Sequence, residues 1–326
     1  MSPISKKLKG LIYGQAIGDA LGLGTEFMSK SEVASKYPRG LHSYAQIIQD
    51  RHRHRWPKGA WTDDTDQMLC ILDSILENQH IDIHDIAARL IAWFKDGGMG
   101  IGQMVMSVIS ARNFLSDPHA AAKEAWEMTG KRAAPNGGIM RTSILGAWQY
   151  KNIEAVKNNT EQVCRITHYD PRCVGSCVAV GVAASLLLQE EKNVPQIMSI
   201  VRQQTVEYSP EIAHYLDMTE SNSLDVFDLD EGLNPQEQNR IGFTLKAMGA
   251  AFWALRHTDS FRDGIEQIIH EGGDADTNAA VTGALLGARD GIDGIPEELV
   301  LGLQDASELE ERLVKLQKLQ QGMENI

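Results

Sequence analysis

Two short acidic stretches, far apart in the chain, contain the residues best suited to chemistry. The first is residues 61–66 and the second is residues 272–278. Each precedes an apolar run that predicts a helix, so both stretches should lie at helix starts. Together they contain six side chains whose oxygen atoms could be metal ligands: Thr62, Asp63, Asp64, Asp274, Asp276 and Thr277.

The acids in these stretches exceed what a helix start needs. An N-cap uses one Thr or Asp, and one or two acids in the first turn answer the helix dipole. Neighbouring carboxylates repel one another and are stable together mainly when a cation lies between them. Their oxygens suit Mg²⁺, Mn²⁺ or Ca²⁺ better than zinc. We therefore predict that the two helix starts meet and hold a metal pair. The alternative is two well-capped helices with solvated acids.

Residues 8–24 predict a helix with glycines at every fourth position: Gly10, Gly14, Gly18 and Gly22. This spacing places them on one stripe. Each glycine inside a helix costs about 0.5–1 kcal/mol relative to alanine. Such a stripe is therefore tolerated where another helix backbone approaches closely. Glu26 follows on a loop just beyond this helix.

Residues 29–59 lack helical periodicity and contain the basic tract Arg51–Arg55. A long loop inside a compact domain is usually functional or disordered. The tract is either a solvated loop or part of a lid whose basic residues approach an anionic ligand.

Two glycine-rich turns are candidates for ligand contact. Gly100 and Gly102 belong to a turn that could let a ligand approach the backbone, although a plain loop is the alternative. In the second turn, Asn136, Gly137 and Gly138 precede a predicted helix over residues 139–148. A turn that enters a helix start presents free amide hydrogens to phosphate or diol oxygens. The alternative for this turn is a purely structural role.

Two more polar residues lie near predicted helix starts. Arg141 has the wrong charge for the first turn of a helix, which suggests an anionic partner. His168 lies just before a helix predicted over 171–188, where a ligand could contact it.

The cysteines are Cys70, Cys164, Cys173 and Cys177. Three of them and His168 form a run that could bind zinc. The spacing is wide for structural zinc, however, and two of the cysteines lie on an apolar helix. Small buried thiols are the main expectation.

The bulk composition is that of a globular protein of 326 residues, with 43% hydrophobic and 23% charged residues. The formal net charge of −13 disfavours extended nucleic-acid binding, which needs a basic surface. We expect no run long enough to span a membrane and no signal peptide. Sparse cysteines predict a cytoplasmic protein.

Helical periodicity without alternating strand patterns predicts one all-α domain over residues 1–326. Within it, 217–240 is expected to be an exposed connection and 297–326 a helical tail.

The ordered set of motifs resembles the ADP-ribosylglycohydrolase family over roughly residues 8–290. The matching pieces are Gly14 to Gly22 with Glu26 after it, Thr62 to Asp64, Asn136 to Arg141, Thr167 with His168, and Gly273 to Thr277.

The resemblance implies a single compact all-helical fold and a binuclear Mg²⁺ or Mn²⁺ centre. It implies that the substrate is an ADP-ribosylated protein or a small-molecule ADP-ribose conjugate. Glu26 would lie on a mobile loop near the metals, and the Asn136 turn and His168 would line the ADP-ribose cleft. The implied metal ligands are Thr62, Asp63, Asp64, Asp274, Asp276 and Thr277.

Hydrolysis would need a general base, for which Glu26 and Asp64 are the candidates. The pyrophosphate would need donors, such as the amides of the Asn136 turn and Arg141. One departure from the family concerns the acceptor: arginine-specific members carry an Asp where this chain has Gln103. Two other functions remain as alternatives, a two-metal phosphohydrolase and a catalytically retired structural member of the family.

Overall fold

The protein is built from α-helices. The computed structural model describes residues 1–191, 193–233 and 241–324, and within these ranges it contains no strand. The predicted all-α class is therefore confirmed. The α-helices are α1 (Pro3–Gly22), α2 (Lys30–Lys36), α3 (Asp63–Asn78), α4 (Ile83–Lys95), α5 (Gln103–Ile109), α6 (Pro118–Met128), α7 (Ile153–Cys164), α8 (Pro171–Leu188), α9 (Val194–Thr205), α10 (Pro210–Met218), α11 (Thr244–His257), α12 (Phe261–His270), α13 (Ala275–Asp290), α14 (Glu297–Gly302) and α15 (Ala306–Glu324).

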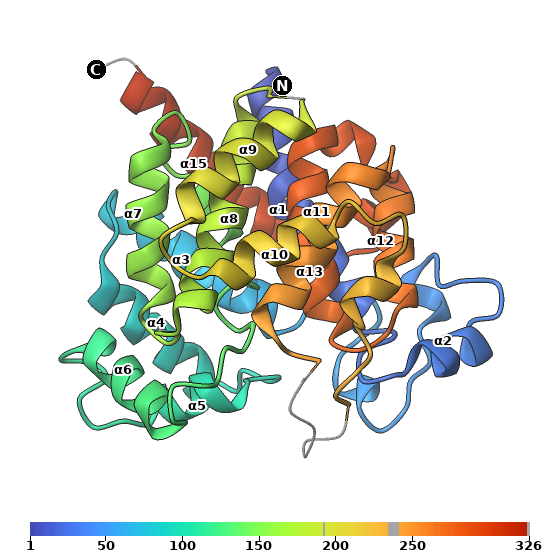
Figure 1. Ribbon diagram of the computed structural model, residues 1–326. Helices are drawn as coiled ribbons and strands as arrows, with labels where there is room; N and C mark the ends of the chain where they lie inside the picture. Colours follow the sequence, from blue (N-terminus) through green and yellow to red (C-terminus); the bar gives the residue numbers. More distant parts are fainter. Residues whose placement is uncertain (192, 234–240, 325–326) are drawn as a thin grey trace.

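Helices α1 and α13 pack backbone against backbone along their length (Figure 1). A Cβ at Gly14 would overlap the carbonyl oxygen of Gly283, and a Cβ at Gly283 would overlap that of Gly14. Gly10 meets Gly287 in the same way. The predicted close approach at the glycine stripe is confirmed, and its partner is the small-residue face of α13.

Helix α8 lies among α7, α9, α11 and α13. It is long and apolar enough to cross a membrane, but 89% of it is buried inside the fold. The expectation that no run reaches such a length is therefore wrong for this segment. Small residues let α8 pack tightly: a Cβ at Gly181 would come within 3.0 Å of the Thr160 hydroxyl on α7.

The helix predicted over residues 139–148 is absent. The chain there makes turns followed by a short 3₁₀ helix, Ser143–Gly146. The hydroxyl of Ser143 donates to Gln15 on α1, and the guanidinium of Arg141 donates to Gln67 on α3. These long-range bonds direct the segment between α1 and α3 in place of a regular helix.

Residues 29–59 contain α2 and two 3₁₀ helices, Tyr44–Gln46 and Arg53–Arg55. The described part of 217–240 contains a 3₁₀ helix, Leu224–Phe227, whose two end residues are buried; residues 234–240 lie outside the described part. The tail forms α14 and α15, and α15 packs against α1 and α3.

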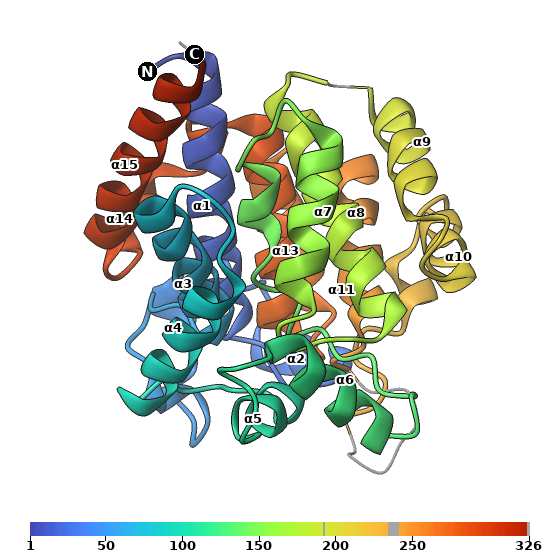
Figure 2. The ribbon, with the colours of Figure 1, turned by 90° about the vertical axis from the view of Figure 1, so that its left-hand side faces the viewer.

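Helices α2, α5 and α6 lie at one end of the molecule, and the two chain termini lie at the opposite end (Figures 1 and 2). Helices α1, α3, α14 and α15 form one side, and α9 and α10 lie on the far side (Figure 2).

Candidate metal centre

The start of α3 is anchored to α1 by Asp19. The fully buried Asp19 carboxylate accepts hydrogen bonds from the backbone N–H groups of Thr62 and Thr65, each at 3.0 Å. It also accepts from their hydroxyls, at 2.8 and 2.7 Å. Because its hydrogen is given to Asp19, the Thr62 hydroxyl keeps oxygen lone pairs for another partner. Burial raises the pKa of Asp19 to about 7, against the opposing effect of these four donors.

The start of α13 is anchored to the loop that carries Glu26. Gly272 and Gly273 have φ values of +72° and +70°, which favour glycine. The amide of Phe27 donates to the Gly273 carbonyl at 2.7 Å, and the amide of Gly273 donates to the Met28 carbonyl at 2.8 Å. This backbone pair places Glu26 beside Asp274.

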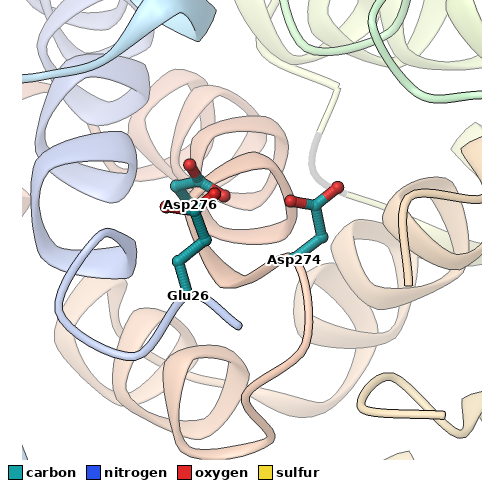
Figure 3. A group of neighbouring side chains, drawn as sticks. All are labelled: Glu26, Asp274 and Asp276. Carbon is teal, nitrogen blue, oxygen red and sulfur yellow. The ribbon is translucent and has the colours of Figure 1, made fainter. Parts of the chain in front are cut away.

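The carboxylates of Glu26, Asp274 and Asp276 form one cluster, with an oxygen from each within 4.8 Å of the others. Figure 3 shows Glu26 extending from the turn after α1 toward Asp276, with Asp274 beside them. Burial and then the charge of Glu26 raise the pKa of Asp274 to about 6, and burial followed by the same charge raises that of Asp276 well above its usual value.

The acids of α3 face the same space. Burial raises the pKa of Asp63 well above its usual value, as do the nearby charges of Asp19, Glu26 and Asp274. Burial and the charges of Asp19, Asp63 and Asp274 do the same for Asp64. A hydrogen bond between the Thr277 and Asp64 side chains opposes this shift. The two acidic stretches are therefore brought together by the packing of α3 against α13.

This arrangement fits a bound divalent cation. One oxygen of Asp64, Oδ1, is buried and has no hydrogen-bond partner among the described residues. Neutral groups supply the donors: Gln67 to Asp63 at 3.1 Å and Asn136 to Asp274 at 2.7 Å. Unpaired buried carboxylates are costly, and hard cations with oxygen ligands supply the missing charge. The groups suited to hold such ions are Glu26, Thr62, Asp63, Asp64, Asp274, Asp276 and Thr277.

The basic tract contacts the loop that carries Glu26. His52 Nε2 lies 2.5 Å from Glu26 Oε2, and the buried Arg53 guanidinium donates to the carbonyl oxygens of Gly24 and Glu26. Arg55 Nη2 lies 2.6 Å from His52 Nδ1 and has only hydrogens to give, so His52 donates from Nε2 to Glu26. Sequence reasoning left these residues as a solvated loop or a lid and did not assign them this contact.

The glycine-rich turn lies directly against Asp63. Gly100 has a φ of +94°, and a Cβ there would overlap Asp63 Oδ1. Gly102 faces open space, with no atom within 4 Å of a Cβ built there. Asp66 supports this turn through Trp93. Its carboxylate accepts hydrogen bonds from the indole N–H groups of Trp61 at 2.8 Å and Trp93 at 2.9 Å. The Trp93 ring in turn packs against Gly98.

The Asn136 turn reaches the centre through a side chain. The backbone N–H of Asn136 donates to the Gly242 carbonyl at 2.9 Å, so this backbone amide is not free for a ligand. The side-chain amide donates to Asp274. The expectation that this turn lies at a helix start is wrong, because no helix follows; the contact of the Gly137 and Gly138 amides with a ligand stays a prediction. Gly137 lies against His168: a Cβ there would be 2.9 Å from Cε1 and 3.1 Å from Nε2 of the imidazole.

Arg141 lies behind the site. Its side chain has 0% exposure, and the guanidinium donates to Gln67 Oε1 at 2.6 Å and to the Thr167 hydroxyl. In this position the guanidinium is enclosed by protein, and its expected contact with the pyrophosphate stays a prediction. The anionic partner suggested by its charge is replaced by neutral oxygen acceptors.

The zinc alternative is wrong for the described residues, in which all four cysteines are free and the only metal-binding group found is the Glu26 cluster. Cys173 instead donates to the Pro135 carbonyl at 3.3 Å. Cys164 and Cys177 lie against Gly138, 3.2 and 3.3 Å from a Cβ built there.

The chain is similar to proteins named as hydrolases of ADP-ribosyl groups. The chain is 26% identical to the ADP-ribosyl-[dinitrogen reductase] glycohydrolase of Rhodospirillum rubrum, over 88% of this chain and 86% of that protein. It is 25% identical to the ADP-ribosylarginine hydrolase Tri1 of Serratia proteamaculans, over 89% of this chain and 73% of that protein. An uncharacterized protein of Archaeoglobus fulgidus is 27% identical over 97% of each chain.

A solved structure described as an ADP-ribosylglycohydrolase-related protein complex has the same fold. It matches with a TM-score of 0.77 and 23% identity, and it covers 98% of this chain and 99% of its own. The sequence model described as ADP-ribosylglycohydrolase matches residues 1–325. With a match over nearly its whole length, the chain belongs to the ADP-ribosylglycohydrolase family.

Proposed function

We propose that this enzyme uses two divalent cations, Mg²⁺ or Mn²⁺, to hydrolyse the glycosidic bond between ADP-ribose and an acceptor. The observation that carries the proposal is the cluster of Glu26, Asp274 and Asp276, whose charges also act on the buried Asp63 and Asp64 of α3; Asp64 Oδ1 has no hydrogen-bond partner among the described residues. Among the described residues no basic side chain pairs with Asp63, Asp64, Asp274 or Asp276, and such a group of buried acids is unfavourable on its own. It becomes favourable when it binds metal, and the family hydrolyses bonds to ADP-ribose.

Bound cations would orient the ribose hydroxyls, lower the pKa of a water molecule and offset charge in the cleft. The residues of the chain do the rest. Glycosidic cleavage develops positive charge on the ribose ring, and the carboxylates of Asp63 and Asp274 lie where they could stabilise it. Asn136 orients Asp274, and Gln67 orients Asp63.

Glu26 and Asp64 are the candidate general bases. Glu26 belongs to a turn outside the helices, and His52 holds one of its oxygens. Asp64 is buried in the first turn of α3 and has one free oxygen, Oδ1. We favour Glu26 for accepting a proton, because it lies outside the starts of α3 and α13, which carry the other candidate metal ligands. Asp64 remains the alternative.

We further propose that ADP-ribose lies between the Gly100 turn and the Gly137 turn. Gly100 borders Asp63 and Gly137 borders His168, so the two turns flank the space in front of the acids. Gly102 leaves open space beside the first turn, and Gly138 continues the second. The ligand would be a conjugate on a protein or on a small molecule.

The acceptor is to be decided by assay. Gln103 stands at the start of α5, next to the glycine-rich turn, and is exposed. A carboxylate at this position could pair with the guanidinium of an arginine acceptor, whereas the uncharged Gln103 side chain lacks that attraction. We therefore expect hydroxyl-linked ADP-ribose to be cleaved better than arginine-linked ADP-ribose. The sparse, free cysteines support action in the cytoplasm.

The test compares ADP-ribosyl-serine, ADP-ribosyl-arginine and a simple phosphate ester, each with Mg²⁺, Mn²⁺ or EDTA. The expected product is free ADP-ribose with an intact pyrophosphate, formed only with metal. Cleavage of the phosphate ester would favour the phosphohydrolase alternative. No turnover of any conjugate, in protein that binds metal, would favour the retired alternative.

Asp63→Asn and Asp276→Asn should each lower turnover by at least about 100-fold, because each removes a metal ligand charge. Metal content by mass spectrometry should fall in parallel. Asp73→Asn, on the same helix as Asp63 but paired with Arg312, is the matched control and should keep both metal and turnover. An Asp63→Asn protein with full turnover in EDTA would refute the proposal.

A further inference from the structure

A chain of buried hydrogen bonds connects the metal centre to His168. Gln67 donates to Asp63 Oδ2 at 3.1 Å, and Arg141 donates to Gln67 Oε1 at 2.6 Å. Arg141 also donates to the Thr167 hydroxyl, which lies 2.8 Å from His168 Nδ1. The linking side chains of Gln67, Arg141 and Thr167 have 0% exposure, so water does not compete for these bonds.

Arg141 sets the direction of every bond in this chain. A guanidinium has five N–H donors and no acceptor. The Gln67 atom facing it must therefore be the carbonyl oxygen, which turns the Gln67 NH₂ group toward Asp63. The Thr167 oxygen must likewise accept from Arg141. Its own hydrogen is then left for the remaining neighbour, His168 Nδ1.

The Thr167 hydrogen fixes the tautomer of His168. If Nδ1 carried the imidazole proton, it would donate to Thr167, and the buried hydroxyl hydrogen would have no described acceptor. The buried Nε2 lone pair would then also lack a donor, so two groups would be without partners among the described residues, whereas the Nε2–H form leaves only the Nε2 proton without one. The neutral imidazole with its proton on Nε2 is therefore the preferred form.

The Nε2 proton has no partner within the protein. His168 Nε2 is buried and forms no hydrogen bond among the described residues. It lies beside Gly137, where a side chain would come within 3.1 Å of it. Burial and then the charge of Arg141 lower the pKa of His168 to about 3, so the ring stays neutral at ordinary pH. A neutral ring whose one N–H has no acceptor among the described residues suits a ligand oxygen that accepts a hydrogen bond.

We infer that Arg141 and Thr167 are positioning residues that hold His168 as the Nε2–H tautomer, so that it donates a hydrogen bond to a phosphoryl or ribose oxygen of the substrate. The choice of ligand oxygen rests on the proposed function. The tautomer does not, because it follows from bonds inside the protein. The two parts can therefore fail separately.

The first test is NMR of the full chain labelled with ¹⁵N-histidine, recorded without metal or substrate. Long-range ¹H–¹⁵N spectra distinguish the two neutral tautomers, and His168→Gln identifies the His168 signals. We expect the Nε2–H form, unchanged from about pH 5 to 8. Thr167→Val should shift His168 toward the Nδ1–H form or a mixture, and Thr167→Ser should restore the original spectrum.

Thr160→Val is the matched control, because Thr160 is equally buried but its hydroxyl donates only to the Val156 carbonyl. It should leave the His168 signals unchanged. The inference is overturned if the unaltered protein shows the Nδ1–H form, or if Thr167→Val leaves the tautomer unchanged. Thermal unfolding of each variant checks that it is folded.

The second test measures turnover of the best ADP-ribose conjugate. Thr167→Val should lower kcat/KM by about 10-fold or more, and Thr167→Ser should recover most of it. A tautomer change with no loss of kcat/KM would overturn the substrate contact and leave the tautomer assignment intact. If no conjugate is cleaved by the unaltered protein, the proposed function fails while the NMR result still decides the tautomer.

Discussion

At the scale of single residues, the acids near the site have different structural roles. Asp63, Asp64, Asp274 and Asp276 face one another, whereas Asp19 accepts four hydrogen bonds from the start of α3. Asp66, the third acid of the first stretch, holds two tryptophans instead. Residues that look alike in the sequence therefore divide into groups that can bind metal and groups that position them.

The buried acids predict how the stability of the metal-free protein depends on pH. Folding raises the pKa of Asp274 to about 6 and of Asp19 to about 7, above their ordinary values. The folded state then binds more protons than the unfolded state, so its stability is greatest below about pH 4 for these groups and declines through about pH 7.

Thermal unfolding in EDTA should therefore give a lower Tm at pH 8 than at pH 5.5. Adding Mn²⁺ or Mg²⁺ should raise the Tm more at pH 8, where the carboxylates are charged and bind the cation. A metal-induced rise in Tm that is smaller at pH 8 would contradict this account of the cluster.

His52 predicts a second effect at this scale. His52→Ala removes a charge-assisted hydrogen bond to Glu26, and such bonds contribute about 1.5–3 kcal/mol. We expect kcat to fall roughly 10-fold or more, with little loss of bound metal, since Asp63, Asp64, Asp274 and Asp276 are untouched. His52→Gln keeps an N–H donor and should retain part of the activity. Faster turnover in His52→Ala would instead mean that His52 restrains Glu26.

Much of the candidate site could be predicted from residue type and order. Surplus acids at two helix starts predicted their meeting, and the glycine turns were located beside them. The roles of Arg141 and His52 could not be predicted, because each depends on a partner from a different part of the fold. A charge at a helix start suggests an anionic partner, but in the interior Arg141 found amide and hydroxyl oxygens instead.

At the scale of elements, the contact between α1 and α13 sets the positions of Glu26 and the α13 acids. Both helices present small residues, so their backbones touch, and their ends near Gly22 and Ala275 lie together. Glu26 follows one of these ends, and Asp276 belongs to the other. A change in the spacing of the two helices would therefore separate Glu26 from Asp276.

Gly14→Ala should test this contact. Its new Cβ would overlap the Gly283 carbonyl oxygen, and overpacking of this kind costs about 1–3 kcal/mol. Chemical denaturation should show that loss, with weaker metal binding. Gly322→Ala is the matched control in α15, where no atom lies within 4 Å of the new Cβ; it should stabilise the helix by about 0.5–1 kcal/mol. Equal effects of the two changes would contradict the close packing.

Elements with strong periodicity were predictable, and the segment after Asn136 was not. Apolar spacing over 139–148 suggested a helix, but Arg141 and Ser143 find buried partners on α3 and α1. Those bonds outweigh the local preference of the segment. Local pattern alone does not report such tertiary contacts.

At the scale of the whole molecule, chemistry is concentrated at one end of the helical bundle. The loops after α1 and before α3, α5 and α13 all lead to the acids, near the end that carries α2, α5 and α6 (Figure 2). The opposite end carries the termini, and there α15 packs on α1 with Leu309, Leu313 and Leu316 buried. The all-α class was predictable from periodicity; this arrangement of loops depends on how the helices cross.

The pairing of α1 with α13 also has a consequence during protein synthesis. Helix α1 leaves the ribosome early, but the helix that covers its bare backbone stripe is translated on the order of 10–50 s later, at about 5–20 residues per second. Throughout that interval the glycine stripe of α1 has no helix packed against it. A chain that ends before α13 would keep the acids of α3, but α1 would lack its packing partner. Such a chain is expected to be bound by chaperones or degraded by proteases.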